Sequence, residues 1–125
     1  MKKAIKTDKA PAAVGPYSQA IESGGFLFIS GQIPLIPGTT QFAEGGVVEQ
    51  THQVLKNIGG ILEAAGLTYE HVVKCTCLLA DIKDFKAMNE VYATYFPGVP
   101  PARAAFQAAN LPLGALVEIE AIAKI

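Results

Sequence analysis

Arg103 lies at the centre of the stretch with the clearest chemical potential, Pro100-Pro101-Ala102-Arg103-Ala104-Ala105-Phe106. The two prolines fix two φ angles and remove two backbone donors, so the approach to Arg103 is predicted to be stiff and extended. A guanidinium keeps its charge at any working pH, and its planar fork of donors matches a carboxylate or a phosphate. In these small, apolar surroundings we expect Arg103 to bind either an internal Asp or Glu or an anionic ligand. The remaining alternative is a solvated surface position.

Two further charges, Glu118 and Glu120, lie in the last predicted strand. Strict alternation over residues 117–124 places both carboxylates on one face of this strand, opposite an apolar face. One interpretation is a solvated sheet edge. The other is that a carboxylate on a strand next to the Arg103 strand holds an attacking water or moves its proton. The pattern favours the two interpretations equally.

Other residue types that support catalysis or metal binding occur without the partners they need. Cys75 and Cys77 are the only cysteines, and because the sequence offers no second pair of ligands we expect buried, reduced thiols rather than a zinc site. His52 and His71 are interpreted as surface or structural residues. The sequence has no nucleophile elbow, paired-histidine metal helix or Gly-rich dinucleotide turn, so we expect neither a metal nor an organic cofactor.

The composition is that of one domain, residues 1–125, which is large enough to fold without disulfides or metals. Ten Lys and Arg residues nearly balance eleven Asp and Glu residues, and no segment collects basic residues. A nucleic-acid partner is therefore not expected. No apolar signal region follows the early lysines, and a run of about 18 apolar residues occurs nowhere. We expect a soluble, cytoplasmic protein without a membrane partner.

Two helices are predicted from hydrophobic periodicity and capping residues. Apolar residues recur at helical spacing over residues 47–65, and Gly66 stands where a C-terminal cap belongs. Gly59-Gly60 inside this helix favours a close packing contact. The second helix is capped by Asp81 or Asp84, and its apolar stripe ends at Pro97-Gly98.

The remaining periodic segments are strand-like. They cover residues 2–6, 17–21, 26–30, 72–80, 103–108 and 116–124. The second and third form a hairpin around Ser23-Gly24-Gly25. The order of elements predicts an α+β fold in which two helices pack on one face of a mixed sheet.

Two of the strand segments, residues 26–29 and 77–80, are apolar on both faces. Two helices cover only one face of such a sheet, and large exposed apolar patches are uncommon on soluble monomers. We therefore expect a homo-oligomer in which copies of the chain cover the second face, with a site between subunits.

Five ordered blocks of the sequence together resemble the RidA family, also called YjgF/YER057c/UK114. The blocks are Gly15-Pro16-Tyr17-Ser18-Gln19-Ala20, Ser30-Gly31-Gln32-Ile33-Pro34, Asp84-Phe85 through Met88-Asn89-Glu90-Val91-Tyr92, Pro101-Ala102-Arg103 and Glu118-Ile119-Glu120-Ala121-Ile122-Ala123. The resemblance runs from about residue 5 to the C-terminus. It implies a chorismate-mutase-like α+β fold, a homotrimer and three clefts at subunit interfaces.

The resemblance also implies an activity. This activity is the hydrolysis of 2-iminobutanoate and 2-iminopropanoate, which pyridoxal-phosphate-dependent dehydratases form, to 2-oxo acids and ammonia. By position, Arg103 would hold the substrate carboxylate and Glu118 would orient or activate the water. The cleft would be lined by Tyr17, Ser30, Gly31 and Asn89. Many family members have a cysteine where this chain has Ala105, whose backbone amide can still bind a carboxylate oxygen.

Imine hydrolysis fits the residues available, because it needs an anion-holding group, a carboxylate and fixed donors but no metal or redox cofactor. Two other functions stay open. One is a small-carboxylate-binding or chaperone-like protein. The other is an endoribonuclease or translation inhibitor, for which the chain offers neither a basic stripe nor interleaved stacking aromatics.

Overall fold

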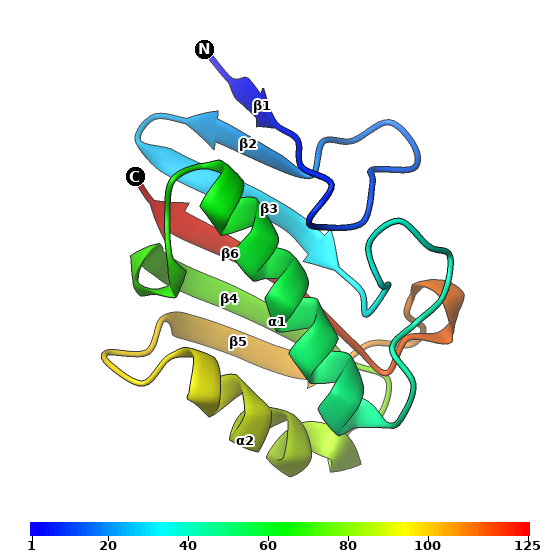
Figure 1. The fold of residues 1–125 in the computed structure, drawn as a ribbon. Coiled ribbons are helices and arrows are strands. Elements are labelled where there is room, and N and C mark those ends of the chain that lie inside the picture. Colours follow the sequence, from blue (N-terminus) through cyan, green and yellow to red (C-terminus); the bar gives the residue numbers. More distant parts are fainter.

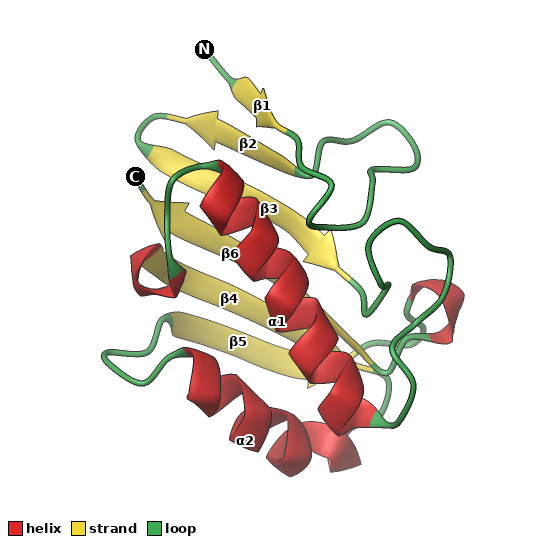
Figure 2. Cartoon of the chain, in the orientation of Figure 1, coloured by secondary structure: helices red, strands yellow, loops and turns green.

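A computed structural model describes residues 1–125 as one mixed sheet with both helices on the same side (Figure 1, Figure 2). The strands are β1 (Lys3–Ile5), β2 (Ala20–Ser23), β3 (Phe26–Gln32), β4 (Val72–Leu79), β5 (Ala102–Gln107) and β6 (Val117–Lys124), and the helices are α1 (Val47–Ala64) and α2 (Phe85–Tyr95). Across the six-stranded sheet their order is β1-β2-β3-β6-β4-β5. Only β4 and β5 pair in parallel, with α2 as the crossover between them. The predicted α+β fold is confirmed.

Glycines define the ends of the hairpin and of α1. Gly24 and Gly25 connect β2 to β3 with φ angles of +61° and +83°, a turn that few other residues adopt. After α1, Gly66 has a φ of +75°, and the amides of Gly66 and Leu67 donate to the carbonyl oxygens of Glu63 and Leu62. The hairpin and the capped helix are confirmed. The first hairpin strand, however, begins at Ala20 rather than at residue 17.

The core lies between the two helices and one face of the sheet. From α1 it takes Val54, Leu55, Ile58, Ile61 and Leu62, and from the sheet it takes Leu27, Ile29, Leu79, Val117 and Ile119. Burial alternates along β6 as predicted, with Glu118 and Glu120 on the face away from the helices. Cys75 and Cys77 are buried and free, and burial raises the pKa of the Cys77 thiol to about 12. Neither helix is long and apolar enough to cross a membrane.

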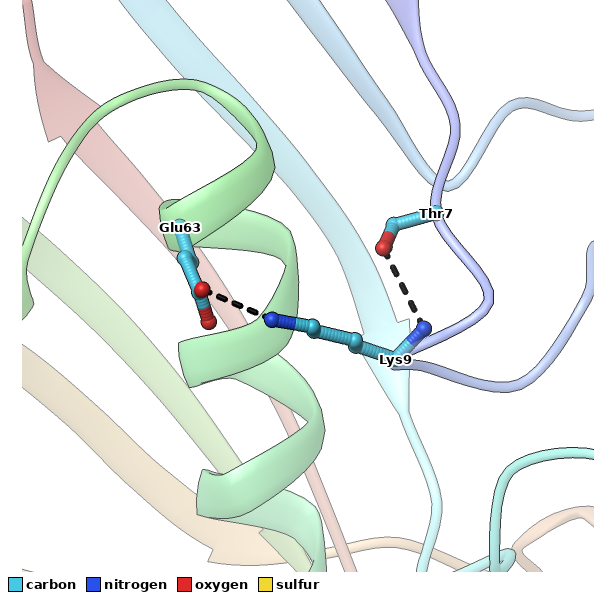
Figure 3. A network of polar contacts seen from close by, with 3 residues as sticks. All are labelled: Thr7, Lys9 and Glu63. Carbon is cyan, nitrogen blue, oxygen red and sulfur yellow. Dashed lines mark hydrogen bonds and ion pairs between the residues drawn. The ribbon is translucent and has the colours of Figure 1, made fainter.

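The loop after β1 packs directly on α1, at the predicted glycine pair. A Cβ at residue 60 would lie 2.5 Å from the carbonyl oxygen of Lys9, so only glycine allows this approach. Lys9 Nζ also donates to Glu63 Oε1 over 2.7 Å, and the Lys9 amide donates to Thr7 Oγ1 over 3.2 Å (Figure 3). Because the ion pair is exposed, it contributes little to stability. The close backbone contact at Gly60 therefore sets how near this loop lies to α1.

We expect Gly60→Ala to destabilise the fold by about 1–3 kcal/mol, because the loop backbone at Lys9 must move away from the new methyl group. Gly98→Ala is the matched control, since a Cβ at residue 98 meets nothing within 4 Å. Urea unfolding of both variants measures the effect. A Gly60→Ala chain as stable as the wild type would show that the loop does not depend on this contact.

The face of the sheet away from the helices, called the open face below, carries exposed aromatic residues. Phe26, Phe28 and Phe106 keep 36%, 45% and 51% of their surface exposed, although each lies within a strand. Phe28 pairs with Ile122 of β6, and Phe106 pairs with Leu78 of β4. The open face thus carries exposed apolar side chains beside the charged Glu118 and Glu120 of β6, and no element of the same chain covers it.

Candidate functional site

Arg103 is the second residue of β5, the last strand of the sheet. Its partner on β4 is the buried Cys75, so the Arg103 side chain lies on the helix face. There it contacts α2. Arg103 Nη1 donates to Asn89 Oδ1 over 2.6 Å, and its Cζ lies 4.9 Å from the ring centre of Tyr92 and 5.3 Å from that of Phe85. Three neutral side chains therefore hold the guanidinium.

No carboxylate of the same chain neutralises Arg103. The single ion pair of the structure joins Lys9 and Glu63. The internal ion pair considered from the sequence is therefore wrong. The Arg103 side chain is exposed, and Asn89 accepts only one of its hydrogen bonds. The remaining donors are free to bind an anion from outside the chain.

Ala105 lies two residues further along β5, opposite Cys77, and is half-buried. Because β5 is an edge strand, some of its backbone amides point away from β4 and are not used by the sheet. Asn89, Arg103 and Ala105 are thus brought together at the β5 edge. We call these three residues the arginine group.

Glu118 lies at the start of β6, on the open face, and is half-buried. Its carboxylate packs against Gly31, where a Cβ would collide with Glu118 Oε2. The strand pairing is irregular between Ile29 and Gln32, which allows this approach. Burial raises the pKa of Glu118, and the nearby Glu120 carboxylate raises it further. A raised pKa makes the Glu118 carboxylate a stronger proton acceptor than an ordinary glutamate.

Ser30 connects this part of β3 to the loop that carries Tyr17. Ser30 Oγ donates to the Ser18 carbonyl oxygen over 2.6 Å, and the Ser30 amide donates to the Gln19 carbonyl oxygen over 3.0 Å. The buried Gln19 side chain holds the loop through four hydrogen bonds to the backbone of Thr7, Ala10 and Pro11.

Tyr17 is 52% exposed and lies at a groove of about 800 Å³ that the same loop forms. Neither Arg103 nor Glu118 lines this groove. Gly31 and Glu118 lie against each other on β3 and β6, and the adjacent Ser30 is hydrogen-bonded to the loop that carries Tyr17. We call these four residues the glutamate group.

The two groups lie apart in one chain. Strand β4 separates β5 from β6 (Figure 1), so the expectation that Glu118 lies on a strand next to the Arg103 strand is wrong. Arg103 lies level with Cys75 of β4, and Glu118 lies level with Leu78. Two strand spacings and three residues place the Cα atoms of Arg103 and Glu118 roughly 14 Å apart. Because the two side chains also lie on opposite faces, they cannot contact one small substrate within a single chain.

Phe85 and Tyr92 contact the site residue Arg103, and the sequence analysis did not predict these two contacts. Their helical stripe predicted core packing, and Tyr92 is indeed buried. A signal is nevertheless present, because Asn89 follows Phe85 by four residues and precedes Tyr92 by three, so all three share one face of α2. His52 and His71 are structural, as expected: His52 Nδ1 lies 2.9 Å from Tyr95 Oη, and His71 Nδ1 accepts from the Thr68 amide.

Comparisons with known proteins cover almost the whole chain. The model of the family described as Endoribonuclease L-PSP matches residues 7–125. A mouse protein named 2-iminobutanoate/2-iminopropanoate deaminase is 57% identical over 98% of this chain and 91% of its own length. The structure of RidA from the Antarctic bacterium Psychrobacter has a TM-score of 0.94 and 48% identity, covering 98% of this chain and 99% of that one.

A further structure, E. coli TdcF with bound serine, has a TM-score of 0.93 and 40% identity, covering 98% of both chains. The agreement of sequence and fold over nearly every residue is specific, and the five sequence blocks fall on the strands, loop and helix described above. The chain belongs to the RidA (YjgF/YER057c/UK114) family, whose model is described as Endoribonuclease L-PSP.

Proposed function

We propose that this protein hydrolyses small 2-imino acids, such as 2-iminobutanoate and 2-iminopropanoate, to 2-oxo acids and ammonia. The observation that carries this proposal is the exposed Arg103 fork, held by neutral groups and left without an internal anion. The name of the mouse relative supports the reaction, and the serine bound to E. coli TdcF supports a small carboxylate as ligand.

In the proposed reaction each group has one task. Arg103 binds the substrate carboxylate through two parallel hydrogen bonds, which fixes the C=N carbon. Glu118 accepts a proton from water as the water oxygen attacks that carbon. That proton passes to the nitrogen, which gives a carbinolamine. The proton of its hydroxyl group then moves to the nitrogen as the C–N bond breaks, so ammonia leaves and the oxygen stays on the carbon as a carbonyl. The backbone of Ser30 and Gly31 and the Tyr17 side chain line the other wall of the cleft.

We further propose that the arginine group of one copy and the glutamate group of a neighbouring copy form one cleft, in a homotrimer with three such clefts. Two features of the chain support this proposal. Arg103 and Glu118 are too far apart to share a substrate within one chain, and the apolar side chains of the open face are uncovered. A closed ring of copies would cover the open face and repeat the same cleft at each interface.

Light scattering tests the assembly. At micromolar concentration we expect a mass of about three times the 13.1 kDa of one chain. Phe28→Lys, which places a charge on the open face, should lower this mass because the charge would have to be buried. Val99→Lys is the control, since Val99 is fully exposed in a loop. A monomeric wild-type protein would contradict both the assembly and the shared cleft.

The activity is tested with an imine made in the assay by a pyridoxal-phosphate-dependent dehydratase acting on threonine. We expect added protein to accelerate 2-oxobutanoate and ammonia release above the spontaneous rate. No acceleration, combined with tight binding of 2-oxobutanoate, would instead indicate the carboxylate-binding alternative.

An endoribonuclease is the second candidate, because the matching family model carries that description. The charge of −1 gives little attraction for a phosphate backbone. We therefore expect no RNA cleavage by the same preparation, and cleavage that Arg103→Ala leaves unchanged would place that activity at another site.

We also propose that the reaction takes place in the cytoplasm. The two buried, free thiols Cys75 and Cys77 support a reducing compartment.

A further inference from the structure

The face of α2 that meets β5 is built around the guanidinium of Arg103. Phe85, Asn89 and Tyr92 share this face, and each contacts the guanidinium. Asn89 accepts one hydrogen bond at the end of the fork, whereas the two rings lie beside Cζ. We call these three side chains the α2 cradle.

An exposed arginine without such contacts adopts many rotamers, and ordering it on binding lowers affinity. Aromatic rings attract a guanidinium through their electron-rich faces, and they accept none of its hydrogen bonds. The cradle therefore restricts the fork while leaving its remaining donors free. An acidic side chain in the same place would also restrict the fork, but it would neutralise the charge and compete with a carboxylate ligand.

We propose that Phe85 and Tyr92 are positioning residues, which orient the Arg103 fork toward the substrate carboxylate by stacking against its guanidinium. This proposal rests on the proposed function for the identity of the ligand. The contacts themselves do not depend on it.

Substitutions at Tyr92 can measure the contribution of the ring separately from that of the hydroxyl group. Tyr92 Oη is buried without a hydrogen-bond partner of regular geometry, and the Cys75 thiol is the polar group beside it. The hydroxyl thus has no role in the stacking. Tyr92→Leu, which removes the ring, should raise KM more than Tyr92→Phe, which keeps it.

Phe85→Leu is the main test, because Phe85 is half-buried and its loss leaves the centre of the core intact. We expect KM for the 2-imino acid, and Kd for 2-oxobutanoate, to rise about two- to fivefold with kcat nearly unchanged. Tyr95→Leu is the matched control: it removes a ring from the same helix, but that ring packs on His52 and Tyr69 rather than on Arg103. It should lower Tm without changing KM.

A double-mutant cycle shows whether Phe85 acts through Arg103. In an Arg103→Ala background, Phe85→Leu should cause no further rise in KM or Kd. An equal rise in both backgrounds, or a rise with Tyr95→Leu as large as with Phe85→Leu, would overturn the positioning role.

An NMR measurement keeps this question separate from the reaction. The Arg103 Nε–H signal, assigned by its absence in Arg103→Ala, should shift when Phe85 is replaced by Leu and stay in place with Tyr95→Leu. An unshifted signal overturns the cradle even if the protein hydrolyses imines. Conversely, a shifted signal in a protein that hydrolyses no imine supports the cradle and overturns the proposed function alone.

Discussion

We expect Arg103→Ala to lower kcat/KM for a 2-imino acid by about 10- to 150-fold, which corresponds to about 1.5–3 kcal/mol for a lost charge-assisted hydrogen bond. Arg103→Lys should be nearly as damaging. An ammonium keeps the charge, but it has no planar fork to pair with both carboxylate oxygens and cannot reproduce the bond to Asn89 alongside them. Steady-state kinetics on both variants measure this difference.

Stability measurements distinguish this role from a structural one. Arg103 has no acidic partner in the chain, so the variants lose only its contacts with α2 and should lower Tm slightly. Lys56→Ala, which removes an exposed cation from α1, is the control for both assays. If Arg103→Ala gave a less stable but fully active trimer, its assignment to the substrate would be wrong.

The second large effect is expected at Glu118. Glu118→Gln should slow hydrolysis by about 100-fold or more, because an amide can orient a water but cannot accept its proton. Binding of 2-oxobutanoate should change little, since Arg103 is intact. Glu120→Gln, the control on the same face of β6, should retain most of the activity. If Glu120→Gln were the damaging change and Glu118→Gln silent, the assignment within this pair would be reversed.

The raised pKa of Glu118 adds a pH dependence with a defined sign. Between the ordinary pKa of a glutamate and the raised value, the folded state holds a proton that the unfolded state has lost. The free energy of unfolding therefore falls as pH rises through this window. Glu118→Gln removes this decrease in the free energy of unfolding. The variant should therefore be more stable than the wild type at neutral pH, and about equally stable at a pH below the ordinary pKa of a glutamate.

The activity should change in the opposite direction. Glu118 must be deprotonated to accept a proton, so wild-type kcat/KM should fall as pH is lowered through the raised pKa. Because the Glu120 carboxylate helps to raise the pKa of Glu118, Glu120→Gln should move the acidic limb of the profile of kcat/KM against pH to lower pH. A limb that stays in place would show that the two carboxylates do not interact.

Local sequence patterns predicted the parts of the fold that depend on near neighbours. Helical spacing and Gly66 marked α1, the glycine pair after Ser23 marked the hairpin, and alternation along residues 117–124 placed Glu118 and Glu120 on one face. Each of these features depends on backbone geometry within a few residues. The first hairpin strand was misplaced at Tyr17 because the buried Gln19 side chain binds loop backbone, a contact that no strand pattern reveals.

The relation between Arg103 and Glu118 depends on strand order, which is not a local property. Consecutive strands are neighbours in most sheets, so β5 and β6 were expected to pair. In this chain β6 instead inserts between β3 and β4 and pairs with both. The family resemblance implied that Asn89 lines the same cleft as Arg103, but the residue pattern did not indicate a direct bond between Asn89 and the guanidinium. Sequence reasoning thus named Arg103 and Glu118 as candidate residues but wrongly placed their strands side by side.

The opposite placement of Arg103 and Glu118 on the sheet has a genetic consequence. If each cleft takes its arginine from one copy and its glutamate from the next, chains with different lesions can complement each other. Assembly from equal amounts of Arg103→Ala and Glu118→Gln chains would leave roughly a quarter of the clefts with both residues intact. Two alleles that are each inactive alone would then support partial activity in one cell, whereas two copies of the same allele would not.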